Sequence, residues 1–287
     1  MLKALGVAMM AIFMAALSGC SGLRVLDTIT PSSGYTRTAD IAYGSDPRQR
    51  LDVYRPLQAA VGQPVVVFFY GGSWNNGARG QYRYVARALA KRGITVVVAD
   101  YRLYPQVRYP SFLEDNAQAV GWTHRHIGEY GGNAQRLFLM GHSSGAYNAA
   151  MLALDPRWLR AVGMQPKDLR GWIGLAGPYD FLPIDNPEVK PVFFFPNSPP
   201  DSQPINHVSA GAPSVLLIAA NSDSYVNPQR NTAGLAKRLR ADGVSVQERY
   251  YARVNHMTLV GAFAWPLAWM APVTDEVVRF IETPPGS

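Results

Sequence analysis

The 287-residue sequence contains a single cysteine, Cys20, and has no dense tract of basic residues. A single cysteine excludes an internal disulfide. Because we expect Cys20 to become the first residue after processing, the folded domain has no cysteine nucleophile. The arginines behind the net charge of +7 are scattered, and no nucleic-acid-binding motif accompanies them, so the sequence predicts a solvated basic surface and no nucleic-acid partner. The histidines and carboxylates lack the spacing of metal ligands, and we predict no metal site.

The remaining composition is that of a globular α/β domain. Hydrophobic residues make up 48% of the chain and charged residues 16%, enough for one large core. Apolar runs of strand length alternate with helical patterns, which favours a mostly parallel central sheet of about eight strands with helices on both faces. We expect strands near 38–43, 50–54, 64–70, 94–100, 136–141, 171–176, 214–220 and 246–251, and helices near 79–92, 111–127, 145–154, 228–242 and 272–282.

One serine lies in a tight turn between a strand pattern and a helix pattern. The turn is Gly141-His142-Ser143-Ser144-Gly145, after the apolar run 137–140 and before the helix-forming run 146–154. In this G-x-S-x-G arrangement the serine has a strained backbone, and side chains at positions 141 and 145 would collide with neighbouring atoms. Because both flanks fit, we predict Ser143 as a nucleophile. An ordinary glycine-serine turn is the alternative.

A serine hydroxyl needs a histidine to take its proton and an acid to orient that histidine. Where this turn is used, the acid and then the histidine follow on loops after later strands. Asp223 follows the apolar run 215–220, and His256 follows the short strand expected at 247–251. We therefore predict Asp223 as the acid and His256 as the base.

Other candidates exist for both roles. Asp180 also follows an apolar strand, so it stays open as an alternative acid. His124 and His126 lie two apart on an expected helix and face different directions. His142 is held in the turn, with its side chain expected to point away from the nucleophile's work, and His207 lies in a proline-rich insertion.

The expected strand 64–70 ends in Gly71-Gly72-Ser73-Trp74. Glycines there let the backbone direct its amides toward a tetrahedral oxyanion, and one such donor is typically worth ~10²–10³ in rate. We predict an oxyanion hole from the backbone at Gly71, Gly72 and Ser73 together with the amide of Ser144. A plain turn at a strand end is the alternative for a glycine pair taken alone.

The motifs together resemble the carboxylesterase and hormone-sensitive-lipase-like branch of the α/β-hydrolase family, and kynurenine formamidase is similar in motif style. The resemblance covers nearly all of the chain after the N-terminal segment: Arg50-Leu-Asp-Val-Tyr-Arg-Pro56, Tyr70-Gly-Gly-Ser-Trp74 in place of the family's HGGxW, Asp100-Tyr-Arg-Leu103 and the serine turn. It implies an α/β-hydrolase fold. Tyr70 stands where the family has a histidine that supports the oxyanion loop, so the hydrogen bonding of that loop should differ.

Two charged residues of these motifs, Asp100 and Arg102, are expected to be structural. They lie at a strand end, within reach of Glu114 or Asp115 on the following helix.

The N-terminus has the pattern of a secretory signal. Lys3 precedes an apolar run over 4–17, and Leu17-Ser-Gly-Cys20 resembles a bacterial lipobox. A spanning helix needs about 20 apolar residues, so lipidation of Cys20 is favoured over a retained helix or ordinary cleavage. We expect a signal peptide over 1–19, a tether over 20–34 and the domain over 35–287. Ser21 after the cysteine indicates, by family habit, the outer membrane of a bacterium, facing the periplasm.

The stretch 181–211 is an expected insertion between the sixth and seventh strands. It is rich in proline and contains Val192-Phe-Phe-Phe-Pro196, which a surface loop would not readily expose. We interpret it as a cap over Ser143. Trp74, Tyr147, Phe193 and Phe194 would then form an apolar wall for an acyl group or an aromatic alcohol. An equally weighted interpretation is that these phenylalanines only dock the insertion on the domain.

The leading functional hypothesis is a serine-dependent carboxylic ester hydrolase that acts through an acyl-enzyme and needs no cofactor. Its partners would be a small or medium ester and, through the lipid on Cys20, a membrane. An aryl formamidase or amidase would use the same residues. The hypothesis from another class is a lipid-anchored binding protein that keeps the fold without turnover.

Overall fold

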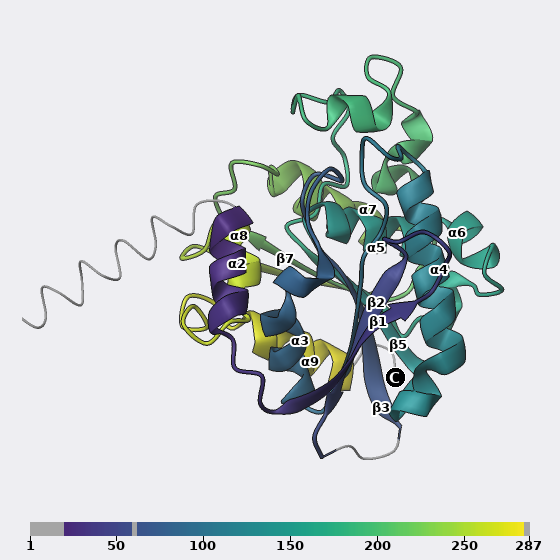
Figure 1. Ribbon diagram of the computed structural model, residues 1–287. Coiled ribbons are helices and arrows are strands. Elements are labelled where there is room, and N and C mark those ends of the chain that lie inside the picture. The colour runs from purple at the N-terminus through teal and green to yellow at the C-terminus, as the bar shows by residue number, and fades with distance from the viewer. Residues whose placement is uncertain (1–19, 59–61, 284–287) are drawn as a thin grey trace, which may run out of the picture.

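The computed structural model describes residues 20–58 and 62–283, which contain an eight-stranded sheet in the order β1-β2-β4-β3-β5-β6-β7-β8 (Figure 1). The pairings of β1 with β2 and of β2 with β4 are antiparallel, and all other pairs are parallel. This confirms the predicted α/β class. The strands are β1 Tyr35–Ala42, β2 Arg50–Pro56, β3 Gln63–Phe69, β4 Thr95–Ala99, β5 Gly132–His142, β6 Gly171–Leu175, β7 Val215–Ala220 and β8 Val246–Tyr251.

The central strands are buried along their whole length. Every residue of β3, β4, β6 and β7 is inaccessible to solvent or nearly so. Helices cover both faces of the sheet, so these strands are continuous apolar runs without polar alternation. The register pairs Phe69 at the end of β3 with Gly141 near the end of β5. The loop that follows β3 therefore starts beside the turn that carries Ser143.

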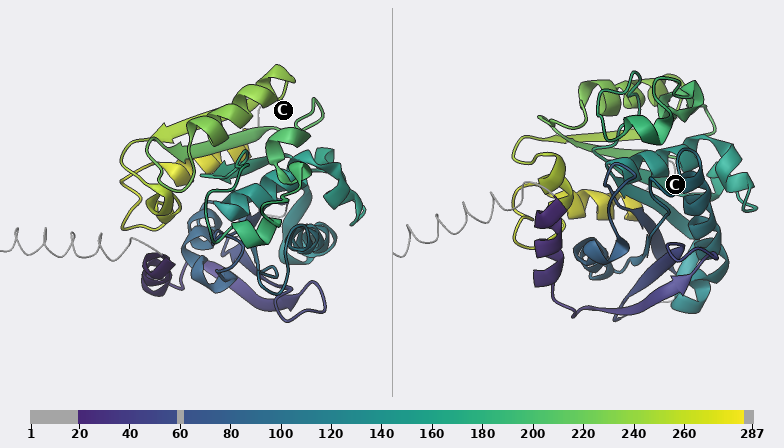
Figure 2. Two further views of the ribbon diagram at one scale, coloured as in Figure 1. Left: turned by 90° about the horizontal axis from the view of Figure 1, so that it is seen from above. Right: turned by 45° about the horizontal axis from the view of Figure 1, so that its top comes forward.

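Helices pack on both faces of the sheet (Figures 1 and 2). On one face α3 contacts β2, β4 and α9; on the other, α5 contacts β3, β5 and β6 and is joined by α4 and α6. The helices are α2 Cys20–Ile29, α3 Arg83–Ala90, α4 Ser111–His126, α5 Ser144–Leu154, α6 Pro156–Arg160, α7 Gly234–Ala241, α8 His256–Gly261 and α9 Val273–Glu282.

Several helix boundaries differ from the sequence prediction. The helix expected at 79–92 is a 3₁₀ turn, η1 Arg79–Gln81, followed by the shorter α3. The helix expected at 228–242 begins with a π-helical turn, Gln229–Ala233, before α7. Neither α6 nor α8 is predicted, because each is only five or six residues long and has too few turns to display a periodic pattern.

The sequence predicts a tether over residues 20–34, but the first ten of them form α2, which docks on the domain. Leu26 is fully buried, and the Asp27 carboxylate accepts a hydrogen bond of 2.6 Å from the backbone N–H of Arg83. Residues 1–19, the predicted signal peptide, lie outside the described residues. In the part of the chain that the structure describes, no helix is long and apolar enough to cross a membrane.

Candidate active site

Ser143 follows directly on β5, in a backbone conformation that L-residues rarely adopt. Its φ is 55° and its ψ −124°, and its N–H donates to the carbonyl of Leu175 on the neighbouring strand. A Cβ on Gly141 would lie 2.1 Å from the Gly145 carbonyl oxygen, and one on Gly145 would lie 2.0 Å from that of Phe69. Both glycines are therefore sterically required, as the turn motif predicts.

The structure brings Ser143, His256 and Asp223 together, although 113 and 33 residues separate His256 from its two partners. Nε2 of His256 lies 2.9 Å from Oγ of Ser143, and Nδ1 lies 2.7 Å from Oδ2 of Asp223. The side chains of His256 and Asp223 are both almost completely buried. The three groups have the spacing of a nucleophile, a base and an acid.

The Asp223 carboxylate is held in its ionised form. Burial raises the pKa of Asp223. The hydrogen bond from His256 and the charge of His256 lower this pKa, and the hydrogen bonds from the amides of Val226 and Tyr225 lower it further. Both amides donate to Oδ1, at 3.0 and 2.8 Å, while Oδ2 faces the imidazole. The net result is a lowered pKa, which leaves a carboxylate to accept the Nδ1 proton of His256.

His256 is the first residue of α8, where the sequence predicts a loop. Asn255 caps this short helix, because its side chain accepts hydrogen bonds from the N–H groups of Met257 and Thr258. Thr258 accepts in return from the N–H of Asn255. The Asn255-x-x-Thr258 pair is the local sequence signal that distinguishes this helix start from a loop.

Asp180, the alternative acid, pairs with a different residue. Its carboxylate binds the guanidinium of Arg230 through two hydrogen bonds of 2.9 and 3.2 Å. His207 bonds to the backbone carbonyl of Asp201, and His126 contacts Glu129 on the surface. Asp223 is thus the carboxylate that contacts His256.

His142 lies closer to the site than its sequence position indicates. The sequence predicts that this side chain points away from Ser143, yet its ring centroid is 4.9 Å from that of His256. His142 Nε2 donates to the backbone carbonyl of His256 over 2.9 Å. Burial, followed by the nearby His256, lowers the pKa of His142 to about 3. His142 is therefore a neutral side chain that holds the start of α8.

The loop after β3 has three consecutive residues with positive φ. The angles are 137° at Gly72, 52° at Ser73 and 58° at Trp74. Gly72 is the glycine that this turn needs, whereas Ser73 and Trp74 adopt the same region without that freedom. A Cβ on Gly71 would lie 2.9 Å from the Cβ of Ser143, so this loop approaches the serine as closely as a backbone can.

The loop also leaves backbone donors free beside Ser143. The amides of Gly72, Ser73 and Ser144 make no hydrogen bond within the described ranges, and Ser144 is the first residue of α5. A helix N-terminus and a curled loop both direct N–H groups outward, as an anion site requires.

Tyr70 takes a definite place under this loop. Its ring stacks between Tyr101 and Tyr82, at centroid distances of 4.8 and 5.7 Å. Arg48 donates to the Tyr70 hydroxyl over 2.8 Å and to the carbonyl of Gly77 over 3.0 Å, which ties both ends of the loop together. Burial raises the pKa of Tyr70 far above its usual value, so the phenol stays protonated.

The structural roles expected for Asp100 and Arg102 are found. Arg102 binds Asp115 on α4 through its backbone N–H and its guanidinium, and Asp100 pairs with Arg79. Within the described residues, no group of three or more histidine, cysteine, aspartate or glutamate residues could hold a metal ion.

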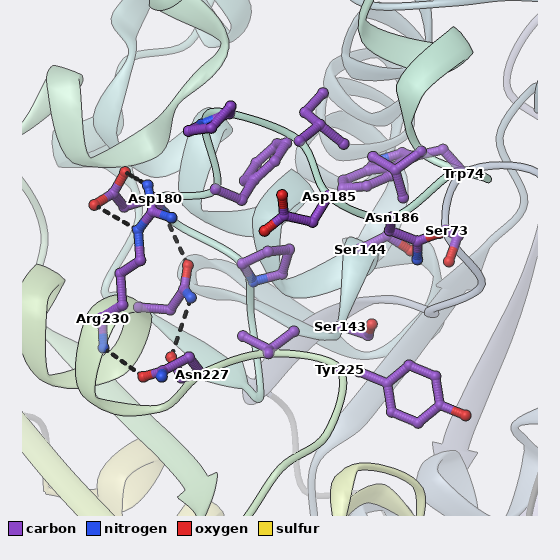
Figure 3. A pocket seen from close by; sticks show the side chains of 17 residues that line it. Ser73, Trp74, Ser143, Ser144, Asp180, Asp185, Asn186, Tyr225, Asn227 and Arg230 are labelled. Carbon is purple, nitrogen blue, oxygen red and sulfur yellow. Dashed lines mark hydrogen bonds and ion pairs between the residues drawn. The ribbon is translucent and has the colours of Figure 1, made fainter. Parts of the chain in front are cut away.

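Two hollows flank Ser143. One has a volume of about 230 Å³ and is lined by Trp74, Phe181, Ile184 and Val226, with Asp180 and Arg230 among its polar residues (Figure 3). The other has a volume of about 240 Å³ and contains His256, Gly72, Asn75, Glu188 and Met257. Ser73, Ser143 and Tyr225 border both. The start of the 181–211 insertion therefore forms part of the wall beside the serine.

Of the four predicted pocket residues, Trp74 lines one of these two hollows and the other three line neither. Phe193 is fully buried behind it, with the two ring centroids 4.8 Å apart, and Tyr147 is buried and donates its hydroxyl to the carbonyl of Ser202 over 2.7 Å. Phe194 is exposed and lies against Arg108. Phe193 thus docks the insertion on the domain, as the alternative interpretation of this cluster predicts, and Tyr147 of α5 contributes to the same contact.

The profile of the family described as BD-FAE matches residues 51–239, about two thirds of the chain. The chain belongs to the BD-FAE family. The match spans β2 to α7 and so contains the serine turn, the loop after β3 and Asp223.

Curated relatives of this BD-FAE member include several esterases. A probable isoprenylcysteine alpha-carbonyl methylesterase of Arabidopsis thaliana is 28% identical over 249 residues, which cover 79% of this chain and 52% of that protein. Esterase LipC of Mycobacterium tuberculosis is 28% identical over 250 residues, with coverages of 79% and 59%. Kynurenine formamidase of Danio rerio is 25% identical over 227 residues, with coverages of 77% and 75%. The chain thus spans only about half the length of the first two relatives.

Solved structures share the fold of this family member. Esterase B from Lactobacillus rhamnosis superposes with a TM-score of 0.75 at 19% identity, covering 97% of this chain and 96% of that one. The hyperthermophilic esterase from Pyrobaculum calidifontis gives a TM-score of 0.73 at 20% identity, with coverages of 95% and 92%. The likeness extends over nearly the whole chain and identifies the α/β-hydrolase fold.

Proposed function

We propose that this protein is a serine-dependent carboxylic ester hydrolase. The observation that carries the proposal is the continuous contact from Ser143 through His256 to Asp223, at 2.9 and 2.7 Å. Esterases among the relatives support the same reaction class.

In the proposed reaction, Oγ of Ser143 attacks the carbonyl carbon of the ester while Nε2 of His256 takes the hydroxyl proton. Asp223 accepts the Nδ1 proton of His256 in a hydrogen bond and stabilises the imidazolium. The tetrahedral intermediate collapses, and the leaving alcohol oxygen receives the proton from Nε2. Water then attacks the acyl-enzyme with the same proton transfers, and the carboxylic acid leaves Ser143 free.

The negative oxygen of each tetrahedral intermediate would be bound by backbone amides of the loop 71–73 and of Ser144. These amides make no hydrogen bond within the described part of the chain, which supports this role, since no internal bond must break when the oxyanion forms. Ser143 and Ser73 both have positive φ, at 55° and 52°, which is backbone strain of the kind that functional sites retain.

The two hollows take different halves of the ester. Nε2 of His256 must reach the leaving oxygen, so the alcohol occupies the hollow that His256 lines. The acyl group then occupies the hollow between Trp74 and the Asp180–Arg230 pair, which His256 does not line. Each hollow holds a small or medium group, and no cofactor takes part.

An aryl formamidase is the second candidate, because the Danio rerio kynurenine formamidase is a relative over 77% of the chain. The same groups would act on a formamide. A non-catalytic binding protein is disfavoured because the three side chains remain in hydrogen-bond contact.

We also propose that the protein is lipid-anchored at Cys20, after removal of residues 1–19, in the outer membrane of a bacterium on its periplasmic side. The lipobox-like Leu17-Ser-Gly-Cys20 supports this location.

The test of the chemistry combines a chromogenic short-chain ester, an aryl formamide and a serine-directed phosphonate. We expect ester turnover with a higher kcat/KM than formamide turnover, and one phosphonate label on Ser143. Ser143→Ala should abolish labelling and turnover. Ser214→Ala is the matched control, since Ser214 lies just before β7, at the opposite end of that strand from Asp223. Ester turnover that persists in Ser143→Ala would refute the proposal, and a preference for the formamide would move it to the second candidate.

A further inference from the structure

Two tryptophans stand exposed on the surface next to α8. The exposed fractions are 67% for Trp265 and 57% for Trp269, both in the loop 262–272 between α8 and α9. The surrounding stretch, residues 254–274, contains no aspartate, glutamate, lysine or arginine. Large apolar side chains gathered without charges are uncommon on a surface that faces only water. This composition indicates that the loop contacts an apolar surface.

Helix α2 extends the same surface. Leu26 of α2 and Leu267 of the loop both approach Gly261, where a Cβ would lie 3.4 and 2.9 Å from their methyl groups. On the outer side of α2, Val25 and Ile29 remain 38% and 41% exposed. Figures 1 and 2 both place α2 on the same side of the molecule as α8 and the loop that follows it. We call Val25, Ile29, Trp265 and Trp269 the α2–α8 surface.

We propose that the α2–α8 surface rests on a lipid bilayer, with Trp265 and Trp269 in the interfacial region. Tryptophan is suited to this position, since its ring is apolar and its N–H is polar. Lipid anchoring at one point leaves a domain free to rotate, whereas a second contact fixes its orientation. The inference goes beyond the hydrolysis proposed above and does not depend on it.

The bilayer fits this surface better than a second copy of the chain. Cys20, which is proposed above to carry the lipid, is the first residue of α2, so the anchor would join the chain beside this surface. To this extent the choice of a bilayer rests on the proposed anchor. Trp269 donates its N–H to the carbonyl of Pro266 over 3.1 Å, so its ring can leave water without an unpaired donor.

The α2–α8 surface lies close to the hollow assigned to the alcohol. Met257 of α8 and Gln81 of η1 both line the alcohol hollow, and α2 packs against both of these elements. The hollow that takes the leaving group therefore lies beside the α2–α8 surface. A bilayer bound there would bring amphiphilic alcohols close to Ser143.

Bromine quenching of tryptophan fluorescence tests the contact. The full chain is reconstituted into phosphatidylethanolamine and phosphatidylglycerol vesicles whose acyl chains are brominated near the headgroup. Residues 1–34 contain no tryptophan, so the N-terminal segment gives no signal of its own. We expect quenching in the wild type and its loss in the double variant Trp265→Phe, Trp269→Phe, which keeps aromatic rings at both positions and so should fold.

Two controls make the result specific. Leu57→Ser changes another exposed apolar residue, between β2 and β3, and should leave quenching unchanged. Ser143→Ala should also keep it, so that a failure of the proposed chemistry does not affect this test. Absence of quenching in the wild type, or equal quenching in the double phenylalanine variant, overturns the proposal. A dimer in detergent that Trp265→Ser, Trp269→Ser dissociates would assign the surface to a second copy instead.

Discussion

The imidazole of His142 donates a hydrogen bond from Nε2 to the backbone carbonyl of His256, over 2.9 Å. The residue next to Ser143 thus fixes the main chain of His256, whose ring contacts the Ser143 hydroxyl. His142 is buried, its Nδ1 has no hydrogen-bond partner among the described residues, and its pKa is lowered to about 3. A charged ring at this position would repel the imidazolium that the proposed mechanism forms on His256.

The first prediction concerns acid stability. Between pH 6.5 and about 3 the unfolded chain binds a proton at His142 that the folded protein excludes, so the free energy of unfolding falls as the pH falls. The contribution of His142 to this slope is about 1.4 kcal/mol per pH unit. His142→Gln removes the titrating group, and urea denaturation at pH 4, 5 and 6 should give a slope smaller by about that amount. Equal slopes in the two proteins would contradict the assigned pKa.

A second prediction separates the effect of the His142 hydrogen bond from the effect of protonating its ring. The amide of glutamine can still donate to the His256 carbonyl, whereas alanine cannot. We expect His142→Ala to lower kcat by about tenfold to a hundredfold with little change in KM, because His256 loses its exact placement. His142→Gln should recover most of that loss at pH 8. If both variants lose kcat equally, the hydrogen bond is not what positions His256.

Local patterns predict the frame of this protein well. Strand patterns in the sequence locate all eight strands, and the valine-rich runs of β3 and β4 are the clearest of them. The serine turn and two later polar loops locate Ser143, Asp223 and His256. Order along the chain is enough there, because the carboxyl ends of parallel strands meet at one edge of the sheet. The catalytic roles of the three remain predictions that the experiments above test.

The sequence does not predict the contacts between residues that are far apart in the chain. The hydrogen bond of His142 crosses 114 residues, and that of Arg48 with Tyr70 crosses 22. Nothing in either local pattern distinguishes a supporting side chain from a solvated one. For the insertion, the prediction fails for another reason. Its short 3₁₀ turns have no helical periodicity, so the spacing of Phe193 and Phe194 does not show which of them is buried.

A third prediction tests the acid. Asp223→Asn should lower kcat for a chromogenic ester by ~10⁴, because the amide no longer selects the His256 tautomer that can accept the Ser143 proton. Asp180→Asn is the matched comparison, since Asp180 also lies in the loop after a strand but binds Arg230. Steady-state kinetics of both variants at pH 8 decide between them, and a larger loss in Asp180→Asn would reassign the acid.

A fourth prediction concerns the support of the oxyanion loop. Tyr70→Phe removes the hydroxyl that accepts from Arg48 and should lower the free energy of unfolding by about 1–3 kcal/mol. We expect kcat to fall as well, because the donors at 71–73 lose their fixed position. Tyr54→Phe is the control: the Tyr54 hydroxyl is buried without a partner among the described residues, so its removal should be neutral or stabilising. Thermal denaturation that affects both variants alike would contradict the role of Tyr70.

The fifth prediction tests which hollow holds which half of the ester. Asn186 lines the hollow assigned to the acyl group and Met257 the one assigned to the alcohol. Asn186→Trp should lower kcat/KM for esters with long acyl chains and spare acetyl esters of bulky alcohols, because the larger ring fills only the acyl side. Met257→Trp should give the opposite pattern. The measurement is kcat/KM for four esters that pair a short or long acyl group with a small or bulky alcohol. Reversal of the two patterns would exchange the assignments, and since His256 must protonate the leaving oxygen, it would also require a different path for that proton.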